Sequence, residues 1–326
     1  MNEICFGDCR KILADWALLG VQAQTCVTSP PYFGLRDYRT EGQIGIEQTP
    51  EEYVSHLVEV FRLVRSLLKG DGTLWLNLGD TYAANRGYQV PSTKGGPKHA
   101  PAQGFKDSKM TVPKGLKPKD LIGIPWRVAL ALQADGWYLR SDIIWHKPNV
   151  MPSSVKDRVT TAHEYIFMLA KEEKYYFNAA AIQEPASNAG KVVSLGPKSF
   201  AKGQALGANV SPSGNGLKDT YEVKEFRNKR SVWTVTTKPF KGAHSAVFPT
   251  DLILPCILAG SRPGDAVLDP FMGSGTTAQV AQENNRRYLG CELNEEYRIL
   301  CDARLKTAIP KESNSCAIEE PNSEKS

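Results

Sequence analysis

AVLDPFMGSGTT, residues 266–277, joins a short β-prone run to a predicted helix through a turn that contains two glycines. Glycines let the backbone approach a ligand closely, and the first turn of a helix offers free N–H groups. Glu292 follows seventeen residues after Gly275, at the end of the next predicted strand. A carboxylate there can accept hydrogen bonds from a ribose diol. The unit therefore predicts a strand–helix–strand half that binds an adenosine-containing cofactor.

Three interpretations of this glycine turn are open. Gly273-x-Gly275-x-x-Ala278 weakly resembles a dinucleotide fingerprint. However, Asp-Pro-Phe at 269–271 separates the strand from the first glycine, whereas a pyrophosphate needs its glycines at the strand end. This spacing favours S-adenosylmethionine over a dinucleotide. An ordinary strand-to-helix turn with a packed phenylalanine is the third interpretation.

A second turn, Thr28-Ser29-Pro30-Pro31-Tyr32, follows a short strand predicted at 24–28. Prolines fix φ and remove backbone donors, so this turn is stiff and its carbonyls point outward as acceptors. A planar ring with an amino group suits such a turn, because the ring can stack on Tyr32 while the amine donates to Ser29 and to the Pro30 carbonyl. A rigid strand-end turn without a ligand is the alternative.

Strands and helices alternate around these two turns. Thr49, Pro50 and Glu52 predict a capped helix start, and Gly70 is the predicted helix end. Apolar periodicity and turn residues predict further strands at 73–78, 138–146, 164–169, 231–235, 266–268 and 287–291, and helices at 125–136, from 249, from 276 and at 294–305. This alternation predicts an α/β fold whose mostly parallel sheet is covered on both faces, with Trp75 and Trp126 in the core.

Length and composition exclude several classes of protein. The 326 residues are 41% hydrophobic and 23% charged, which is typical of globular domains. No run approaches the ~18 apolar residues of a membrane span, and MNEICFGDCRKIL lacks an apolar signal-peptide core. Seven scattered cysteines without a CxxC pair argue against a zinc ribbon or a disulfide framework. We therefore expect no metal site and a cytoplasmic location.

Two polar segments interrupt the alternation and carry positive charge. From Arg86 to Lys119, eight basic residues and one acidic residue give a net charge of +7. Residues 186–230 contain eight basic and three acidic residues, a net of +5. Solvated loops are the simpler interpretation, but two such loops on one α/β frame favour nucleic-acid binding. The polar, aperiodic residues 311–326 predict a disordered tail.

The two turns together resemble those of the amino-group DNA methyltransferases. The match is to the permuted class, in which TSPPY (28–32) precedes the cofactor motif DPFMGSGTT (269–277). Three shorter runs add to the resemblance: Gly7-Asp8, FPTDL at 248–252 and CELN at 291–294. The resemblance covers roughly residues 4–82, 120–180 and 231–305. It implies a Rossmann-like, S-adenosylmethionine-dependent methyltransferase fold with a mostly parallel twisted sheet and basic DNA-recognition insertions.

The resemblance also implies a division of the chain. Residues 1–185 would form the catalytic half of the methyltransferase domain, with the basic insertion 83–119. Residues 186–230 would form a target-recognition insertion, and residues 231–310 the cofactor-binding half of the same domain. The expected partners are double-stranded DNA and a cognate restriction endonuclease, and no membrane.

Carried over position by position, the family motifs assign six residues to the cofactor: Asp8, Asp269, Phe271, Gly273, Gly275 and Glu292. Phe271 and the two glycines would wrap its methionine and adenosine parts, and Glu292 would take its ribose hydroxyls. Asp269 would lie near the methionine amine, and Asp8 at the adenine end.

The same carry-over assigns Ser29, Pro30 and Tyr32 to the flipped base. An exocyclic amine is a poor nucleophile because its lone pair is delocalised into the ring. Hydrogen bonds from its two N–H groups favour a more tetrahedral nitrogen, so transfer needs positioning and electrostatics rather than a metal. The base must leave the duplex to react. In the resembling family, serine at this first position is commoner in cytosine enzymes and aspartate in adenine enzymes, which favours cytosine N4 and leaves adenine N6 open.

Other chemistries and residues carry less weight. Pro255-Cys256 resembles the dipeptide of cytosine ring-carbon methylation, but it lies in an apolar helical run and is assigned to the core. A dinucleotide oxidoreductase and a catalytically silent DNA-binding protein are the remaining alternatives, and the intact motifs argue against both. The run 145–149 ends a strand and could line the base pocket, and His163-Glu164 begins the next strand.

Overall fold

The computed structural model describes residues 2–35, 40–83, 112, 115–194, 220–237 and 248–310. The chain divides into two compact units, residues 1–177 with 231–326, and residues 178–230. The second unit begins at Asn178, upstream of the boundary expected at 186. Most of the basic insertion 83–119, the middle of 186–230 and the whole tail 311–326 lie outside the described residues.

The larger unit is built on an eight-stranded sheet with the order β1-β12-β11-β2-β3-β5-β4-β10. Its strands are β1 (Glu3–Phe6), β2 (Ala23–Thr28), β3 (Leu68–Leu78), β4 (Tyr138–His146), β5 (His163–Ala170), β10 (Val232–Thr234), β11 (Ala266–Asp269) and β12 (Arg287–Glu292). Neighbouring strands are parallel, except that β5 is antiparallel to both β3 and β4. The prediction of a mostly parallel sheet is confirmed. β5 is the exception because a loop, rather than a crossover helix, joins it to β4.

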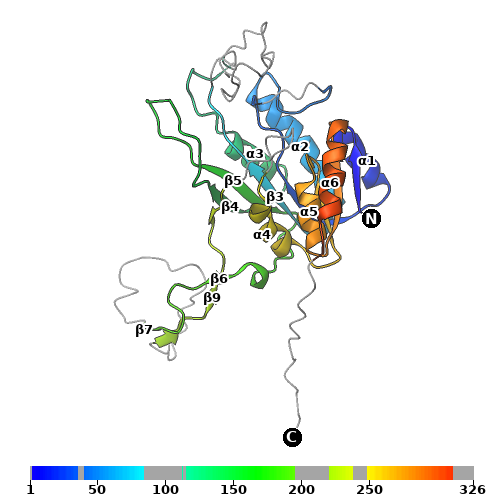
Figure 1. The fold of residues 1–326 in the computed structure, drawn as a ribbon. Coiled ribbons are helices and arrows are strands. Elements are labelled where there is room, and N and C mark those ends of the chain that lie inside the picture. The colour runs from blue at the N-terminus through cyan, green and yellow to red at the C-terminus, as the bar shows by residue number, and fades with distance from the viewer. Residues whose placement is uncertain are drawn as a thin grey trace. The chain divides into compact units, whose positions relative to one another are not determined.

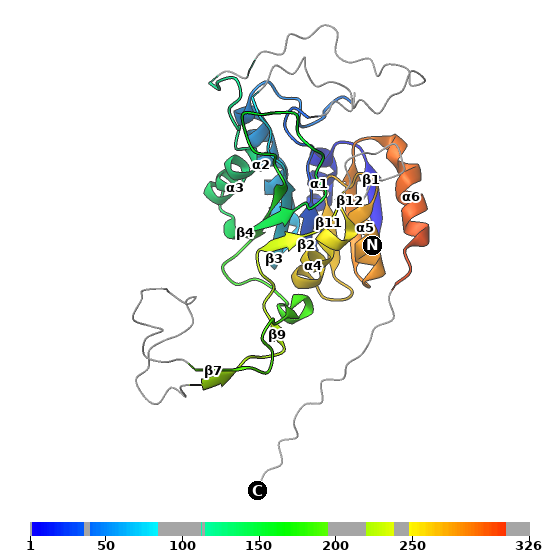
Figure 2. The ribbon, with the colours of Figure 1, turned by 60° about the vertical axis from the view of Figure 1, so that its left-hand side comes forward.

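Helices cover both faces of this sheet (Figure 1). They are α1 (Cys9–Leu18), α2 (Pro50–Leu67), α3 (Ile124–Ala134), α4 (Thr250–Gly260), α5 (Thr276–Glu283) and α6 (Arg298–Thr307). α1, α2 and α3 pack side by side in one layer, and α4, α5 and α6 in the other (Figure 2). Every residue of the central strand β2 is therefore buried, as expected for a strand covered on both faces.

The start of α2 follows the predicted capping box. The Thr49 side chain accepts from the Glu52 N–H, and the Glu52 carboxylate accepts from the Thr49 N–H. The predicted end at Gly70 is wrong. α2 ends at Leu67 because β3 begins directly at Leu68, which pairs with Ala23 of β2.

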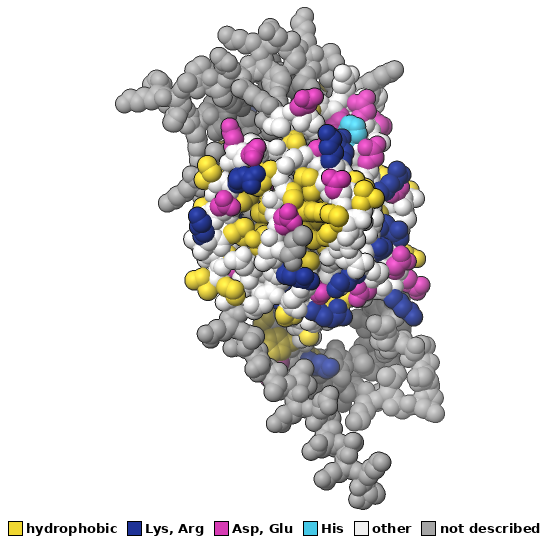
Figure 3. Space-filling view, turned by 90° about the vertical axis from the view of Figure 1, so that its right-hand side faces the viewer, with side chains coloured by type: hydrophobic (Ala, Val, Ile, Leu, Met, Phe, Trp, Pro, Cys, Tyr) yellow, Lys and Arg dark blue, Asp and Glu magenta, His cyan; other side chains and the backbone are white. Residues whose placement is uncertain are grey.

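Two elements near the N-terminus, β1 and α1, were absent from the predicted set. β1 is a four-residue edge strand, too short to show a pattern. α1 begins after the N-cap Asp8 and buries Cys9, Leu13 and Trp16 at helical spacing. Figure 3 views the side of the unit on which α1 and α6 lie, where apolar side chains gather near the centre of the face.

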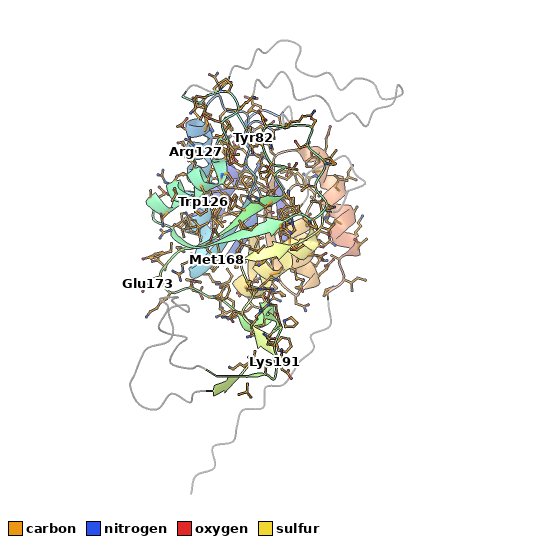
Figure 4. All side chains as sticks on the ribbon, turned by 90° about the vertical axis from the view of Figure 1, so that its left-hand side faces the viewer. Tyr82, Trp126, Arg127, Met168, Glu173 and Lys191 are labelled. Carbon is orange, nitrogen blue, oxygen red and sulfur yellow. The ribbon has the colours of Figure 1, made fainter. Side chains whose placement is uncertain are left out.

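The two tryptophans expected in the core have different positions. Trp75 in β3 is 2% exposed, as predicted, whereas Trp126 in α3 is 38% exposed. The Trp126 ring, whose place on α3 is labelled in Figure 4, makes T-shaped contacts with two rings of β5. The ring centroids lie 5.1 Å from Phe167 and 5.9 Å from Tyr165. α3 places this ring at the border of the core. The burial of Trp126 therefore depends on its position on the helix and could not be predicted from the residue type alone.

The smaller unit, residues 178–230, contains only short elements in its described part. β6 (Glu184–Pro185) pairs with β9 (Phe226–Arg227), and β7 (Val192–Ser194) pairs with β8 (Thr220–Glu222). The Glu184 carboxylate accepts from Arg227 and from Arg230 at 2.9 and 2.5 Å, which holds the first pair of strands to the end of the unit. Across the described parts of both units, every helix is too short or too polar to cross a bilayer.

Candidate active site

The glycine turn and the proline turn lie side by side although they are far apart in the sequence. β11 is next to β2, with Leu268 opposite Cys26, so the carboxyl ends of both strands meet at one edge of the sheet. Thr28, at the end of β2, donates a 2.6 Å hydrogen bond to the Asp269 carboxylate, 241 positions later in the chain. In open α/β sheets ligands bind in the crevice outside the carboxyl ends of the strands.

A cavity of about 440 Å³ opens at this edge. Seven of the nine residues predicted for the site line it: Asp8, Ser29, Pro30, Tyr32, Phe271, Gly273 and Glu292. Asp269 and Gly275 are outside its lining. Four residues from the β3, β4 and β5 strand ends complete the side next to the proline turn: Asn77, Trp145, Lys147 and Glu164.

Asp269 and Gly275 shape the cavity from behind. The buried Asp269 carboxylate accepts from Thr28 and Thr277, both at 2.6 Å, and from the Phe271 N–H at 3.0 Å. Burial raises its pKa to about 6 against the opposite effect of these hydrogen bonds. Gly275 precedes α5 with φ 85°, a conformation that favours glycine, and an added Cβ would lie 3.3 Å from the Cys301 Cα in α6. Both residues shape the glycine turn, and their contact with the cofactor stays a prediction.

Glu292 presents an acidic acceptor at the end of β12. One carboxylate oxygen accepts from the Gly273 N–H at 2.7 Å and the other from the Asn294 N–H at 2.8 Å. The residue is 9% exposed, and burial raises its pKa to about 7. Each oxygen has a further lone pair for a hydroxyl donor. This pair of acceptor oxygens fits the ribose diol of an adenosine cofactor.

Asp8 has a structural duty besides lining the cavity. Its side chain caps α1 through the Arg10 N–H at 2.9 Å and pairs with the Arg10 guanidinium at 2.7 Å. Burial raises the pKa of Asp8, but the hydrogen bonds and charge of Arg10 outweigh burial and leave the pKa below its ordinary value. Asp8 is therefore a fixed anion at the cavity wall.

The proline turn leads into a chain of hydrogen bonds. Ser29 Oγ donates to Tyr32 Oη at 3.3 Å, and Tyr32 Oη donates to Glu164 Oε2 at 2.7 Å. Burial and the neighbouring Glu164 charge raise the Tyr32 pKa well above its ordinary value, so the phenol keeps its proton. Tyr53 Oη donates to the Pro31 carbonyl at 2.9 Å and fixes the turn from below.

Glu164 accepts from two further side chains. Asn77 Nδ2 donates to Glu164 Oε2 at 3.2 Å, and the Lys147 ammonium donates to Oε1. The ammonium also lies 4.2 Å from the centre of the Trp145 ring. Sequence reasoning proposed the Trp145 segment as lining but missed Asn77. Its signal was a single amide near the end of the buried apolar run TLWLNL.

The cysteine of the rival Pro255-Cys256 dipeptide lies away from this cavity. Cys256 is 1% exposed inside α4 and is outside the cavity lining. No group of three histidine, cysteine or acidic side chains in the described ranges could hold a metal ion.

Comparison with known proteins agrees with this geometry. The DNA methylase family of N6 and N4 enzymes matches residues 23–301. The chain is 49% identical over 281 residues to the Type II methyltransferase M.Cfr9I of Citrobacter freundii, covering 86% of this chain and 80% of that protein. It is 46% identical over 306 residues to M.SmaI of Serratia marcescens, covering 93% and 90%.

Solved structures share the fold. The PvuII DNA methyltransferase, described as cytosine-N4-specific, has a TM-score of 0.58 at 20% identity, over 93% of this chain and 86% of that one. The M1.HpyAVI–SAM complex has a TM-score of 0.53 at 17% identity, over 94% and 100%. With the family match across most of its length and close relatives along nearly all of it, the chain belongs to the N6/N4 DNA methylase family.

Proposed function

We propose that the protein transfers a methyl group from S-adenosylmethionine to the N4 amine of a flipped cytosine in double-stranded DNA. The observation that carries this proposal is the junction of the two turns in one cavity, with Ser29 on one side and Glu292 on the other. Membership of the DNA methylase family supports the reaction class.

The cofactor would be held by Phe271, Gly273 and Glu292, with Asp8 at the far end. When bound, S-adenosylmethionine supplies an electrophilic methyl carbon whose bond to sulfur breaks with its electron pair left on sulfur. Glu292 orients the ribose through its two carboxylate oxygens. The backbone N–H groups before α5 are held in place because Asp269 ties the turn to β2.

The target base would lie against Tyr32, with its amine directed at Ser29 Oγ and the Pro30 carbonyl. Both atoms accept hydrogen bonds from the amine and draw its lone pair out of the ring plane. When the N–C bond forms, the nitrogen becomes cationic and must lose one proton. A fixed acceptor beside the amine lowers the barrier, because no group has to reorient during the transfer.

Cytosine is favoured over adenine by Ser29, the residue commoner in cytosine enzymes of the resembling family. The cytosine-N4-specific description of the PvuII enzyme, which shares this fold, is consistent with that choice. Adenine N6 is the second candidate, because its amine presents the same two donors. The names of the closely related Type II methyltransferases support a role beside a cognate restriction endonuclease.

The basic segments 83–119 and 186–230 would bind the DNA, the first through the backbone and the second through the target sequence. Their charge excess of +7 (from Arg86) and +5 motivates this assignment. Neutralising the lysines of 83–119 should reduce the slope of log Kd against log salt concentration. An unchanged slope would remove that segment from the DNA interface.

The test is mass spectrometry of nucleosides from plasmid DNA incubated with the protein and S-adenosylmethionine. We expect N4-methylcytosine, its loss with Ser29→Ala, and full activity with the matched control Ser153→Ala on an exposed loop. N6-methyladenine would overturn the base assignment and keep the reaction class. If neither nucleoside is methylated, the proposal fails.

A further inference from the structure

One buried carboxylate controls the direction of hydrogen bonding on the base side of the cavity. Glu164 begins β5, and its side chain is 16% exposed. Three donors converge on it: the Tyr32 phenol, the Asn77 amide and the Lys147 ammonium. An ionised carboxylate only accepts, and its two oxygens offer about four lone-pair sites, so all three donors can be satisfied together.

The first consequence concerns Ser29. Tyr32 donates its only hydroxyl proton to Glu164, so its oxygen can act only as an acceptor toward Ser29. Ser29 therefore donates its own proton to Tyr32, at 3.3 Å. The remaining lone pairs of Ser29 Oγ are left for another donor. The target amine carries two N–H donors, so the acceptor lone pairs of Ser29 Oγ are complementary to it.

The second consequence concerns Asn77, which is 4% exposed at the cavity lining. Its amide nitrogen donates both to Glu164 and to the Tyr165 carbonyl at 3.1 Å, which determines which end of the amide is the nitrogen. Its carbonyl oxygen is buried and has no hydrogen-bond partner among the described residues. Glu164 therefore fixes the Asn77 amide as well as the Tyr32 phenol.

We propose that Glu164 is the positioning residue of the base pocket: it fixes the direction of the Tyr32 hydroxyl so that Ser29 Oγ, beside the Pro30 carbonyl, presents an acceptor to the amine of the flipped base. This inference rests on the proposed function, because it needs an exocyclic amine as the target. It holds equally for cytosine N4 and adenine N6.

The same chain gives the amine proton a route. After methyl transfer the cationic nitrogen releases one proton to Ser29 Oγ, which passes its own hydroxyl proton to Tyr32. Tyr32 in turn gives its proton to the Glu164 carboxylate. Ser29 and Tyr32 each accept one proton and release one, so both hydroxyls end neutral. Glu164 then releases this proton to solvent and ionises again, which the adjacent Lys147 ammonium favours.

An amide cannot replace this carboxylate. In Glu164→Gln, one oxygen and one NH2 group face three donors, so at least one donor must turn away. If the Tyr32 hydroxyl turned to donate to Ser29, the Ser29 proton would point into the cavity and face the donors of the amine. We expect the single-turnover rate of methyl transfer to fall about 100-fold, the effect of removing one aligned polar group from a site. The dissociation constant for cofactor should change less than about threefold, and that for the target duplex no more than about fivefold.

Two variants and one control make the test specific. Tyr32→Phe keeps the ring and breaks the chain, and should cost a similar factor. The double variant with Glu164→Gln should be little worse than either single variant, because both remove the same chain. Glu164→Asp retains an acceptor-only group and should recover part of the rate. Glu172→Gln, an exposed glutamate just beyond β5, is the matched control and should be unaffected.

A binding measurement separates positioning from folding. Wild-type protein without cofactor should bind a duplex with the mapped target base about 5-fold more tightly than one carrying a base analogue that lacks the exocyclic amine, the value of about one hydrogen bond. Glu164→Gln should lose this preference.

The outcomes distinguish the two proposals. A wild-type protein that methylates no amine refutes the proposed function. A wild-type protein that methylates normally, together with a Glu164→Gln variant of wild-type rate and wild-type preference for the amine, refutes this inference alone. Additive losses in the double variant would also refute it.

Discussion

Ionisation of Glu292 should make the cofactor-free protein less stable as the pH rises. Burial places its pKa at about 7 in the folded chain, against an ordinary value of 4.5. The folded state therefore binds the proton more tightly than the unfolded state. Its stabilising contribution is fully present below about pH 4.5 and is lost as the pH rises through about 7. The gap of about 2.5 pH units corresponds to about 3 kcal/mol.

The perturbation is Glu292→Gln, which is neutral at every pH. Its amide oxygen can still accept from Gly273, but its NH2 group meets the Asn294 N–H, so a constant penalty of about 1 kcal/mol is expected. The penalty does not depend on pH and cancels in a comparison across pH. The free energy of unfolding of the variant, relative to wild type, should increase by about 2.5 kcal/mol between pH 5 and pH 8.

The assay is urea unfolding of both proteins, without cofactor, at half-unit steps from pH 5 to pH 8. Calorimetric titration with S-adenosylmethionine provides the functional counterpart. Wild-type affinity should rise from pH 6 to pH 8, because an ionised carboxylate is the stronger acceptor for ribose hydroxyls, and the variant should show no such rise. Stability curves that run parallel across the whole range would refute the assignment of a proton to Glu292.

Three further substitutions test the frame around the cavity. Thr28→Val deletes a hydroxyl donor to buried Asp269 and should cost about 1–3 kcal/mol by urea unfolding, and no loss would contradict the bridge between the strands. Tyr53→Phe removes the bond to the Pro31 carbonyl and should cost about 1 kcal/mol and slow methyl transfer, whereas unchanged values in both assays would show that the turn is rigid without it. Gly275→Ala forces a side chain into a left-handed conformation and should lower stability by about 1–2 kcal/mol and weaken cofactor binding in calorimetry, and a more stable variant would be inconsistent with the φ of 85°.

Local chemistry made much of the fold predictable. Thr49 and Glu52 define a helix start through two hydrogen bonds between residues only three positions apart, and the structure contains both of them. Helix ends were harder to predict. Gly70 looked like a stop, but the pairing of Leu68 with Ala23 of a distant segment begins the strand earlier. That pairing depends on tertiary contacts, which no local pattern contains.

The direction of β5 and the position of β1 were also beyond local patterns. The residues of β5 contain no pattern that sets its direction, and only the lack of a helix between residues 146 and 163 indicates its reversal. β1 is a four-residue strand at the sheet edge, without an alternating pattern to mark it. Its partner β12 lies almost the whole chain away.

The two turns predicted the centre of the site, but not the residues beside it. Ser29 and Gly273 belong to short motifs whose chemistry is visible in sequence. Asn77 and Glu164 do not, because each acts only through a partner brought near by the sheet. The motif of Asp269 predicts contact with the cofactor, which stays a prediction. The hydrogen bonds that its carboxylate accepts from Thr28 and Thr277 could not be inferred from the motif.

The bond between Thr28 and Asp269 has a consequence during protein synthesis. At about 5–20 residues per second, the ribosome needs roughly 10–50 s to make the 241 residues between them. Throughout that interval β2 lacks its β11 neighbour, and one side of a strand destined for the centre of the sheet is an open edge. A nascent chain is therefore exposed to wrong pairing until its last quarter emerges, and a chain released early can neither close its sheet nor modify DNA.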